Sequence, residues 1–322
     1  MNRWAILLRW EGLLAIAIVL TMLINALLSP YFWDINTLSD ATFNFTEKAL
    51  IALPMALLIV AGEIDISVAA ILALTSVAMG FAAEANWPTS IVVITGVVTG
   101  ALAGAINGLL VTIARVPSII ATIGTLSLFR GIAYGLLGDR VLKAYRPDFA
   151  VFGQGYVVGP VSVELVCFAL AALVAGVLLH RTNIGRRLYA IGSNAVAARF
   201  SGVAVGRYRF WLFVATGVAS GCAAVLLTSR LGSTRPSIAQ GWELEVISMV
   251  ILGGVAITGG RGTILGVVLA AVLLGLVTFG LGLHNVPGIV MSVVVGCLLI
   301  SVVSIPLIAE RRALPLPPKP RA

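Results

Sequence analysis

Long apolar runs, separated by short polar connections, dominate the pattern of the chain. With about 20 apolar residues per membrane crossing, we expect ten spans. They lie at about 10–29, 47–61, 66–83, 90–114, 118–137, 162–180, 208–228, 243–257, 263–283 and 288–308. The runs are continuous and do not alternate with polar residues, so they predict helices and exclude a transmembrane β-barrel. An even number of spans places both termini on the same side of the membrane.

Two of these segments, 47–61 and 243–257, are shorter than a crossing requires. Each holds about 15 residues, enough for a helix of about 22 Å, whereas the hydrocarbon core is roughly 30 Å thick. Each leads into a glycine-bearing turn, Gly62–Asp65 in one case and Thr258–Gly262 in the other. We therefore expect broken or tilted helices with turns at some depth in the protein. The pairs 47–83 and 243–283 share one orientation, which suggests a parallel internal repeat.

Composition excludes a water-soluble fold. Of the 322 residues, 60% are apolar and only 11% are charged, and the mean hydropathy is +1.08. So few charged side chains cannot cover the surface of soluble domains of this total size. Helices satisfy their own backbone hydrogen bonds in lipid, so we expect an all-α, polytopic membrane protein that forms a single transmembrane domain over residues 1–322.

The net charge of +8 is explained by membrane topology, because the basic residues form short clusters between the apolar runs. Fourteen Lys and Arg residues fall on the side of the N-terminus and six on the other side. The positive-inside rule then places both termini in the cytoplasm. The sequence thus predicts a multi-pass membrane protein and gives no indication of nucleic-acid binding.

Two connections are long enough to meet water-soluble partners. The loop at 138–160 is expected outside and is either a docking loop or a plain solvated connection. The inner loop, 181–207, contains a candidate short helix at about 193–202. Ser193 or Asn194 can cap its start, and Gly202 stands where a C′ glycine belongs. So short a helix is not stable alone, so it lies against lipid headgroups or another protein.

Ionisable residues near the membrane centre are costly and mark functional candidates. Arg130 lies about twelve residues into its span. We expect it to face the bundle or a wet cavity and to pair with a carboxylate of a neighbouring helix, either as a structural ion pair or in a pathway. Glu63 and Asp65 share a turn after a short span, where a pathway role and a simple cytoplasmic loop explain them equally well.

One predicted helix carries a stripe of small residues. Gly96, Gly100, Gly104 and Gly108 recur every four residues and form a G-x-x-x-G packing face. Asn107 lies beside this stripe. An interhelical hydrogen bond is the favoured role for Asn107, and contact with a transported solute is the alternative.

The sequence gives no support for an enzyme. It has no G-x-x-x-x-G-K-[ST] phosphate loop, and its two histidines, His180 and His284, fall on opposite sides of the expected membrane. We therefore expect no catalytic residues, no metal site and no cofactor in this chain. The pattern favours a passage for a neutral polar solute, with the energy supplied by another subunit.

Four sequence motifs resemble the permease subunits of ribose-type bacterial ABC sugar importers, with the rhamnose and autoinducer-2 importers at least as similar. The first is Gly62–Val68, similar to the family's G-G-[IL]-D-[IL]-S-V-G, although Glu63 replaces the second glycine and Ala69 the last. The others, in the family's order, are Asn107–Leu110 with 117–131, Thr182–Asn194 with Ala197–Gly202, and Leu252–Gly254 with Gly259–Thr263 and Gly266.

The resemblance implies a permease dimer, homodimeric or heterodimeric, in a bacterial inner (plasma) membrane. Cytoplasmic ABC ATPase subunits would lie below it, and a periplasmic substrate-binding protein would lie above it. ATP and Mg²⁺ would be held by the ATPase. The helix at 193–202 would be the coupling helix. Its contact residues would be Arg186, Arg187, Ser193, Asn194, Ala198, Arg199, Ser201 and Gly202.

Two alternatives to an importer subunit remain at this point. A self-sufficient, ion-coupled secondary transporter would make use of Glu63, Asp65 and Arg130. A multi-pass membrane enzyme has no supporting cluster. The candidate pathway residues are Glu63, Asp65, Ser67, Asn107 and Arg130.

Overall fold

The described part of the chain consists almost entirely of helices. The computed structural model describes residues 10–43, 45–298 and 300. The helices are α2 (Trp10–Leu28), α3 (Ile35–Thr42), α4 (Thr46–Val60), α5 (Val68–Glu84), α6 (Thr89–Thr112), α7 (Ser118–Leu137), η1 (Pro147–Ala150), α8 (Val151–Gln154), α9 (Val163–Arg181), α10 (Asn183–Ser193), α11 (Ala195–Phe200), α12 (Val205–Leu231), α13 (Trp242–Leu252) and α14 (Ile264–Leu283). An apolar helix, Gly288–Leu298, follows. The two short strands are β1 (Tyr156–Val158) and β2 (Val161–Ser162).

The helical membrane fold predicted from the sequence is confirmed. Within the described residues, six helices are long and apolar enough to cross a bilayer: α2, α6, α7, α9, α12 and α14. The helix α5 and the helix Gly288–Leu298 are apolar but shorter. Of the last expected span, 288–308, residues 299 and 301–308 lie outside the described residues. The expected segment 243–257 shortens to the 11 residues of α13.

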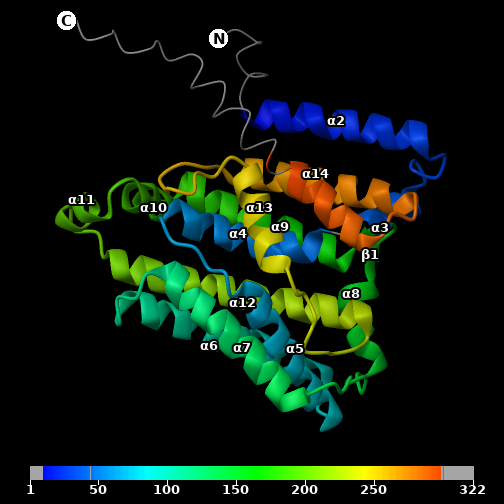
Figure 1. The fold of residues 1–322 in the computed structure, drawn as a ribbon, viewed down its shortest axis with the longest axis horizontal. Helices are drawn as coiled ribbons and strands as arrows, with labels where there is room; N and C mark the ends of the chain where they lie inside the picture. Colours follow the sequence, from blue (N-terminus) through cyan, green and yellow to red (C-terminus); the bar gives the residue numbers. More distant parts are fainter. Residues whose placement is uncertain (1–9, 44, 299, 301–322) are drawn as a thin grey trace, which may run out of the picture.

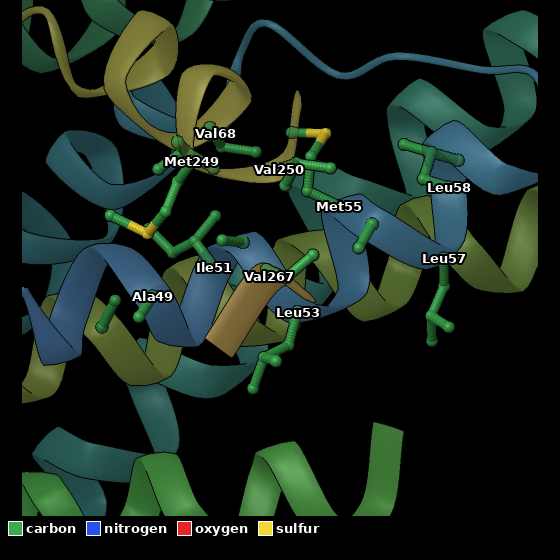
Figure 2. Packing of buried hydrophobic residues seen from close by; sticks show 14 of the residues in the cluster. Ala49, Ile51, Leu53, Met55, Leu57, Leu58, Val68, Met249, Val250 and Val267 are labelled. Carbon is green, nitrogen blue, oxygen red and sulfur yellow. The ribbon is translucent and has the colours of Figure 1, made fainter. Parts of the chain in front are cut away.

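The helix α4 forms the centre of the bundle. Thirteen of its fifteen residues are buried, and α4 packs against α9, α12, α13 and α14. Figure 2 shows side chains leaving α4 on several sides, with Ile51 near Met249 of α13. A helix that is apolar all round and surrounded by other helices does not need the length of a lipid-facing span. This explains why the 47–61 run is short.

The helices lie in layers that run roughly side by side (Figure 1). The helix α2 covers α14 on one side of the bundle, while α12 separates α4 from α6, and α5 packs on both α6 and α7. The helices α10 and α11 project beyond one end of the bundle, which we call the α11 end.

The close contact between α6 and α12 confirms the predicted glycine packing face. A Cβ placed on Gly104 would lie 2.3 Å from the carbonyl oxygen of Phe213, and one on Gly100 would lie 2.3 Å from that of Gly217. Only glycine permits backbones to approach this closely. The glycines of α6 thus face Gly217 and Gly221 of α12, glycines that we did not predict as partners.

We expect Gly104→Val to destabilise the protein by at least the 1–3 kcal/mol typical of overpacking, because the new side chain meets rigid backbone. The midpoint of thermal unfolding in detergent measures this effect. Gly131→Ala is the control, since no heavy atom lies within 4 Å of a Cβ at that position. An unchanged midpoint for Gly104→Val would mean that the α6–α12 contact is looser than described.

The outer loop 138–160 is more ordered than a plain solvated connection. It contains η1, α8 and the start of an antiparallel hairpin formed by β1 and β2, which the sequence pattern did not indicate. Tyr145 stacks on the buried Phe149, with ring centroids 4.7 Å apart. The backbone N–H of Gly153 donates to the Ser229 hydroxyl of α12 at 2.8 Å. This loop is therefore fastened to the bundle.

Candidate functional site

The predicted short helix of the inner loop is present as α11, and its caps are those expected. The Asn194 side chain accepts hydrogen bonds from the backbone N–H groups of Val196 and Ala197, at 3.0 and 2.9 Å. Gly202 follows the helix with a φ of +82°, a left-handed conformation that glycine adopts freely. Of the two candidate caps, the structure selects Asn194, since Ser193 ends α10.

The α11 helix presents an apolar face to the outside of the molecule. Val196 and Phe200, four residues apart and so on one face, are 66% and 89% exposed. On the other side, Ala198 is buried against the bundle. Figure 1 places α11 at the extreme tip of the α11 end. Two exposed apolar side chains on one face of a short helix indicate a contact surface, either for lipid headgroups or for another protein.

Some arginines of the inner loop are held by hydrogen bonds to neighbouring side chains, and others are exposed. Arg187 donates to the hydroxyl of Tyr208 and lies 5.8 Å from the centroid of its ring, while Arg186 donates to the side chain of Asn183 within α10. Arg199, Ser201 and the preceding Ser193 are exposed. Seven of the eight predicted coupling residues are therefore exposed along a strip from α10 to Gly202, whereas Ala198 is buried against the bundle and does not belong to that surface.

Glycines at the end of α10 connect the strip to the two glycine-bearing turns that follow α4 and α13. The Gly260 backbone N–H donates to the Val60 carbonyl at 2.9 Å. A Cβ on Gly192 would lie 1.8 Å from that same oxygen, and one on Gly259 would lie 3.0 Å from the Cα of Gly62. The two glycine-bearing turns predicted from the sequence thus meet beside the end of α10. The end of α10 thus contacts both turns through backbone atoms.

A buried polar cluster closes the segment 61–67 between α4 and α5. The Asp65 carboxylate accepts bonds from the Ser67 N–H at 2.9 Å and hydroxyl at 2.6 Å. Thr216 of α12 donates to it at 3.1 Å. Asn107 of α6 donates to Ser67 at 2.7 Å and to Asp65 at 3.3 Å. All four residues are fully buried. The cluster joins three helices, which confirms the interhelical hydrogen bond predicted for Asn107.

Glu63 points away from this cluster, into a basic cavity at the α11 end. Its carboxylate lies 2.9 Å from Arg209 of α12. The cavity measures about 690 Å³, and Arg115, Arg199 and Arg207 also line it. The structure therefore separates Glu63 from Asp65, two residues away, and links Glu63 to the helix that follows α11.

Arg130 lies in the middle of the bundle, and its partners correct the sequence prediction. We expected a carboxylate, but its guanidinium donates to backbone carbonyls: Pro236 at 2.7 Å, Ile238 at 2.8 Å and Ala69 at 3.2 Å. A guanidinium has five N–H donors in a planar fork, so it bonds to several carbonyls at once. Arg130 thus fastens the segment 232–241 to the start of α5.

The outer loop 138–160 also contacts the segment 232–241. The Tyr145 hydroxyl lies 2.6 Å from that of Thr234, and Leu142 and Thr234 form an isolated antiparallel bridge. Burial raises the pKa of Tyr145 to about 12, so the phenol stays protonated and neutral at physiological pH.

A second ion pair connects α4 and α12. Glu47 at the start of α4 forms a bidentate ion pair with Arg230 at 2.8 and 3.1 Å.

The structure brings together Asp65, Ser67 and Asn107, but places Glu63 and Arg130 at separate sites. Sequence reasoning missed Thr216, Arg209 and Phe200. Thr216 and Arg209 act through contacts between segments about 150 residues apart, which local spacing does not reveal. Phe200 carried a usable signal, because it is the one aromatic side chain in a short helix that otherwise consists of small apolar residues and Arg199.

We expect Asn107→Ala to lower the midpoint of thermal unfolding and to leave solute recognition unchanged. The substitution removes donors from the buried Asp65 carboxylate, a loss of about 1–3 kcal/mol. Unfolding in detergent and the solute concentration for half-maximal uptake measure the two effects. A normal midpoint with a raised half-maximal concentration would instead place Asn107 in the solute pathway.

Comparisons with known proteins agree on the class of this chain. Residues 37–303 match the family model described as branched-chain amino acid transport system / permease component. The autoinducer 2 import system permease protein LsrD of Yersinia pseudotuberculosis serotype O:1b is 36% identical over 300 residues, covering 91% of this chain and 90% of that protein. LsrD of Yersinia pestis strain Pestoides F matches with the same identity and coverage. No solved structure matches the chain.

Proposed function

Because this chain belongs to the family of branched-chain amino acid transport system permease components, we propose that it carries autoinducer 2 or a similar small sugar-like solute. The chain is the permease subunit of an ATP-binding-cassette importer and lies in the bacterial inner membrane; it is a transport component and not an enzyme. The observation that carries the solute proposal is the 36% identity to LsrD over nine-tenths of both chains. Nothing favours the secondary-transporter alternative.

An importer of this class works with an ATPase and with a protein that delivers the solute. We propose that the delivering protein is periplasmic and that ATP and Mg²⁺ are bound only by the cytoplasmic ATPase subunit. The permease operates as a dimer, either with a second copy or with a related permease. The family model and the LsrD relatives support these assignments at the level of the class.

The proposed topology has about ten spans, with both termini and the α11 end in the cytoplasm. The excess of basic residues on that side supports this orientation. The outer loop 138–160 then faces the periplasm. The inner loop 181–207 faces the ATPase.

Coupling is proposed to run through α11. The Val196 and Phe200 side chains dock into a groove of the ATPase, and Arg186, Arg187 and Arg199 flank the contact. Closure of the ATPase moves α10, and the glycine contacts at its end pass this movement to the turns at Gly62 and Gly259. The Glu63–Arg209 ion pair links the start of α12 to the same turn.

The buried cluster of Asp65, Ser67 and Asn107 is proposed to hold the 61–67 segment in place, and not to contact the solute. Full burial of these side chains supports this role. Glu63 remains a candidate for contact with a passing solute, since it lines the basic cavity at the α11 end.

Reconstitution into proteoliposomes tests the function. We expect uptake of radiolabelled autoinducer 2 to require the permease pair, the ATPase with ATP, and the delivering protein. The chain without an ATPase should give no uptake under a proton or sodium gradient. Gradient-driven uptake by this chain alone would overturn the assignment in favour of a secondary transporter. ATP-dependent uptake of ribose without uptake of autoinducer 2 would agree with the import function but would contradict the proposed solute.

A further inference from the structure

The segment 232–241 returns from the end of α12 to the middle of the bundle. Its depth is fixed by Arg130, which lies twelve residues after the start of α7 and seven before its end and donates to the Pro236 and Ile238 carbonyls. The helix α13, which continues this segment, has only 11 residues, a length of about 16 Å. The irregular backbone thus reaches well into the thickness that lipid surrounds.

Alternate residues of this segment point in opposite directions. Pro236 and Ile238 are buried, whereas Arg235, Ser237 and Gln240 are exposed. Irregular backbone at membrane depth occurs only where protein buries it or where it lines a water-filled cavity. An arginine and a glutamine exposed to lipid tails would be costly. Their exposed side therefore faces water.

A cavity of about 360 Å³ opens on this side. Arg235, Ser237, Gln240 and Trp242 line it, together with Ile238 and Leu231. Its volume falls within the range typical of small-molecule sites. Trp242 is held by Lys48, whose ammonium lies 4.9 Å from the ring centroid, and Lys48 in turn pairs with Glu245 at 2.5 Å. The lining is thus supported by α4 and α13 and is not a loose loop.

We propose that the face of the 232–241 segment bearing Arg235, Ser237, Gln240 and Trp242 contacts the transported solute. This inference rests on the proposed import function. The lining combines cationic, hydroxyl and amide groups with one large aromatic ring and with four aliphatic side chains, Leu227, Leu231, Ile238 and Ala239. The polar groups can bond to the hydroxyls of a small polyhydroxylated solute, and the apolar ones can pack on its carbon skeleton. The cavity opens on the surface of the chain, so the face of a second permease completes the passage. Arg130 is a positioning residue, because it holds the segment through the backbone.

The test is thiol accessibility during ATP-driven turnover in the reconstituted importer. Cys167, Cys222 and Cys297 are first replaced by alanine, and ATP-dependent uptake of this background is confirmed. Ser237→Cys and Gln240→Cys are then made separately. The control is Leu102→Cys, because Leu102 lies near the middle of α6 and is 61% exposed on a face that we assign to lipid. The probe is the membrane-impermeant anion sulfonatoethyl methanethiosulfonate, applied to both sides.

We expect Ser237→Cys and Gln240→Cys to react at least tenfold faster than Leu102→Cys and to lose uptake on reaction. Arg235→Gln should slow the reaction of Ser237→Cys with this anion, but not its reaction with the cationic trimethylammonium analogue. Rates no higher than that of Leu102→Cys, in a background that retains ATP-dependent uptake, would overturn the proposed contact face. Failure of the wild-type importer to show ATP-dependent uptake would count against the import function instead, so the two failures are distinguishable.

Discussion

Phe200→Asp is expected to abolish ATP-driven uptake while leaving the permease folded and in the membrane. The side chain is 89% exposed at the end of α11, so its replacement removes no packing within this chain. In the assembled importer, Phe200 would be desolvated in the ATPase groove, where truncation of an aromatic anchor costs about 2 kcal/mol or more. A buried, unpaired carboxylate at that point is still less favourable.

Two measurements separate coupling from folding in this variant. Uptake into proteoliposomes is expected to fall at least tenfold, while the thermal midpoint of the isolated permease stays within a degree or two of the wild type. Val157→Asp is the matched control, because Val157 is also exposed and apolar but lies in strand β1 of the outer loop. Normal uptake by Phe200→Asp would exclude α11 as the coupling contact.

Arg130→Met is the second substitution with a large expected effect. It leaves the Pro236, Ile238 and Ala69 carbonyls without their charged donor, and hydrogen bonds to charged groups contribute about 1.5–3 kcal/mol each. The 232–241 segment then loses the contact that ties Pro236 and Ile238 to α7 and to the start of α5, although Thr234 still bonds to Ser76 of α5. We expect uptake to fall at least tenfold and the thermal midpoint to drop.

Arg130→Lys distinguishes the fork geometry from the charge alone. A lysine keeps the positive charge but presents it as a point, and cannot reach three carbonyls in a planar arrangement. We therefore expect only partial recovery of uptake relative to Arg130→Met. Full recovery with lysine would show that the charge matters and the three carbonyl bonds do not. Wild-type uptake by both variants would contradict the positioning role.

The local sequence pattern was sufficient to predict several helices of this fold. The bounds of α6, α7 and α14 follow from apolar runs long enough to cross lipid, and α11 follows from its caps, Asn194 and Gly202. The glycine stripe of α6 correctly predicted a close helix contact. These features depend on residues within one or two helical turns of each other, where spacing and backbone conformation determine the structure.

Long-range contacts account for what the sequence did not reveal. The partner of the α6 stripe is Gly217, more than 100 residues away. Arg130 was expected to find a carboxylate, but non-helical backbone in the middle of the bundle offers carbonyls that helices would have used internally. Likewise, α4 is short because other helices surround it, a property of the assembled bundle and not of its own residues. The β1–β2 hairpin lies in a loop with no alternating pattern long enough to detect.

The most direct test of this account is a pull-down of the tagged chain from native membranes after chemical cross-linking, with the associated proteins identified by mass spectrometry. The account predicts recovery of an ABC ATPase with the wild-type chain, and much less of it with Phe200→Asp. Recovery of the wild-type chain without any ATPase would contradict the central claim that this permease is driven by a separate, ATP-hydrolysing subunit docked at α11.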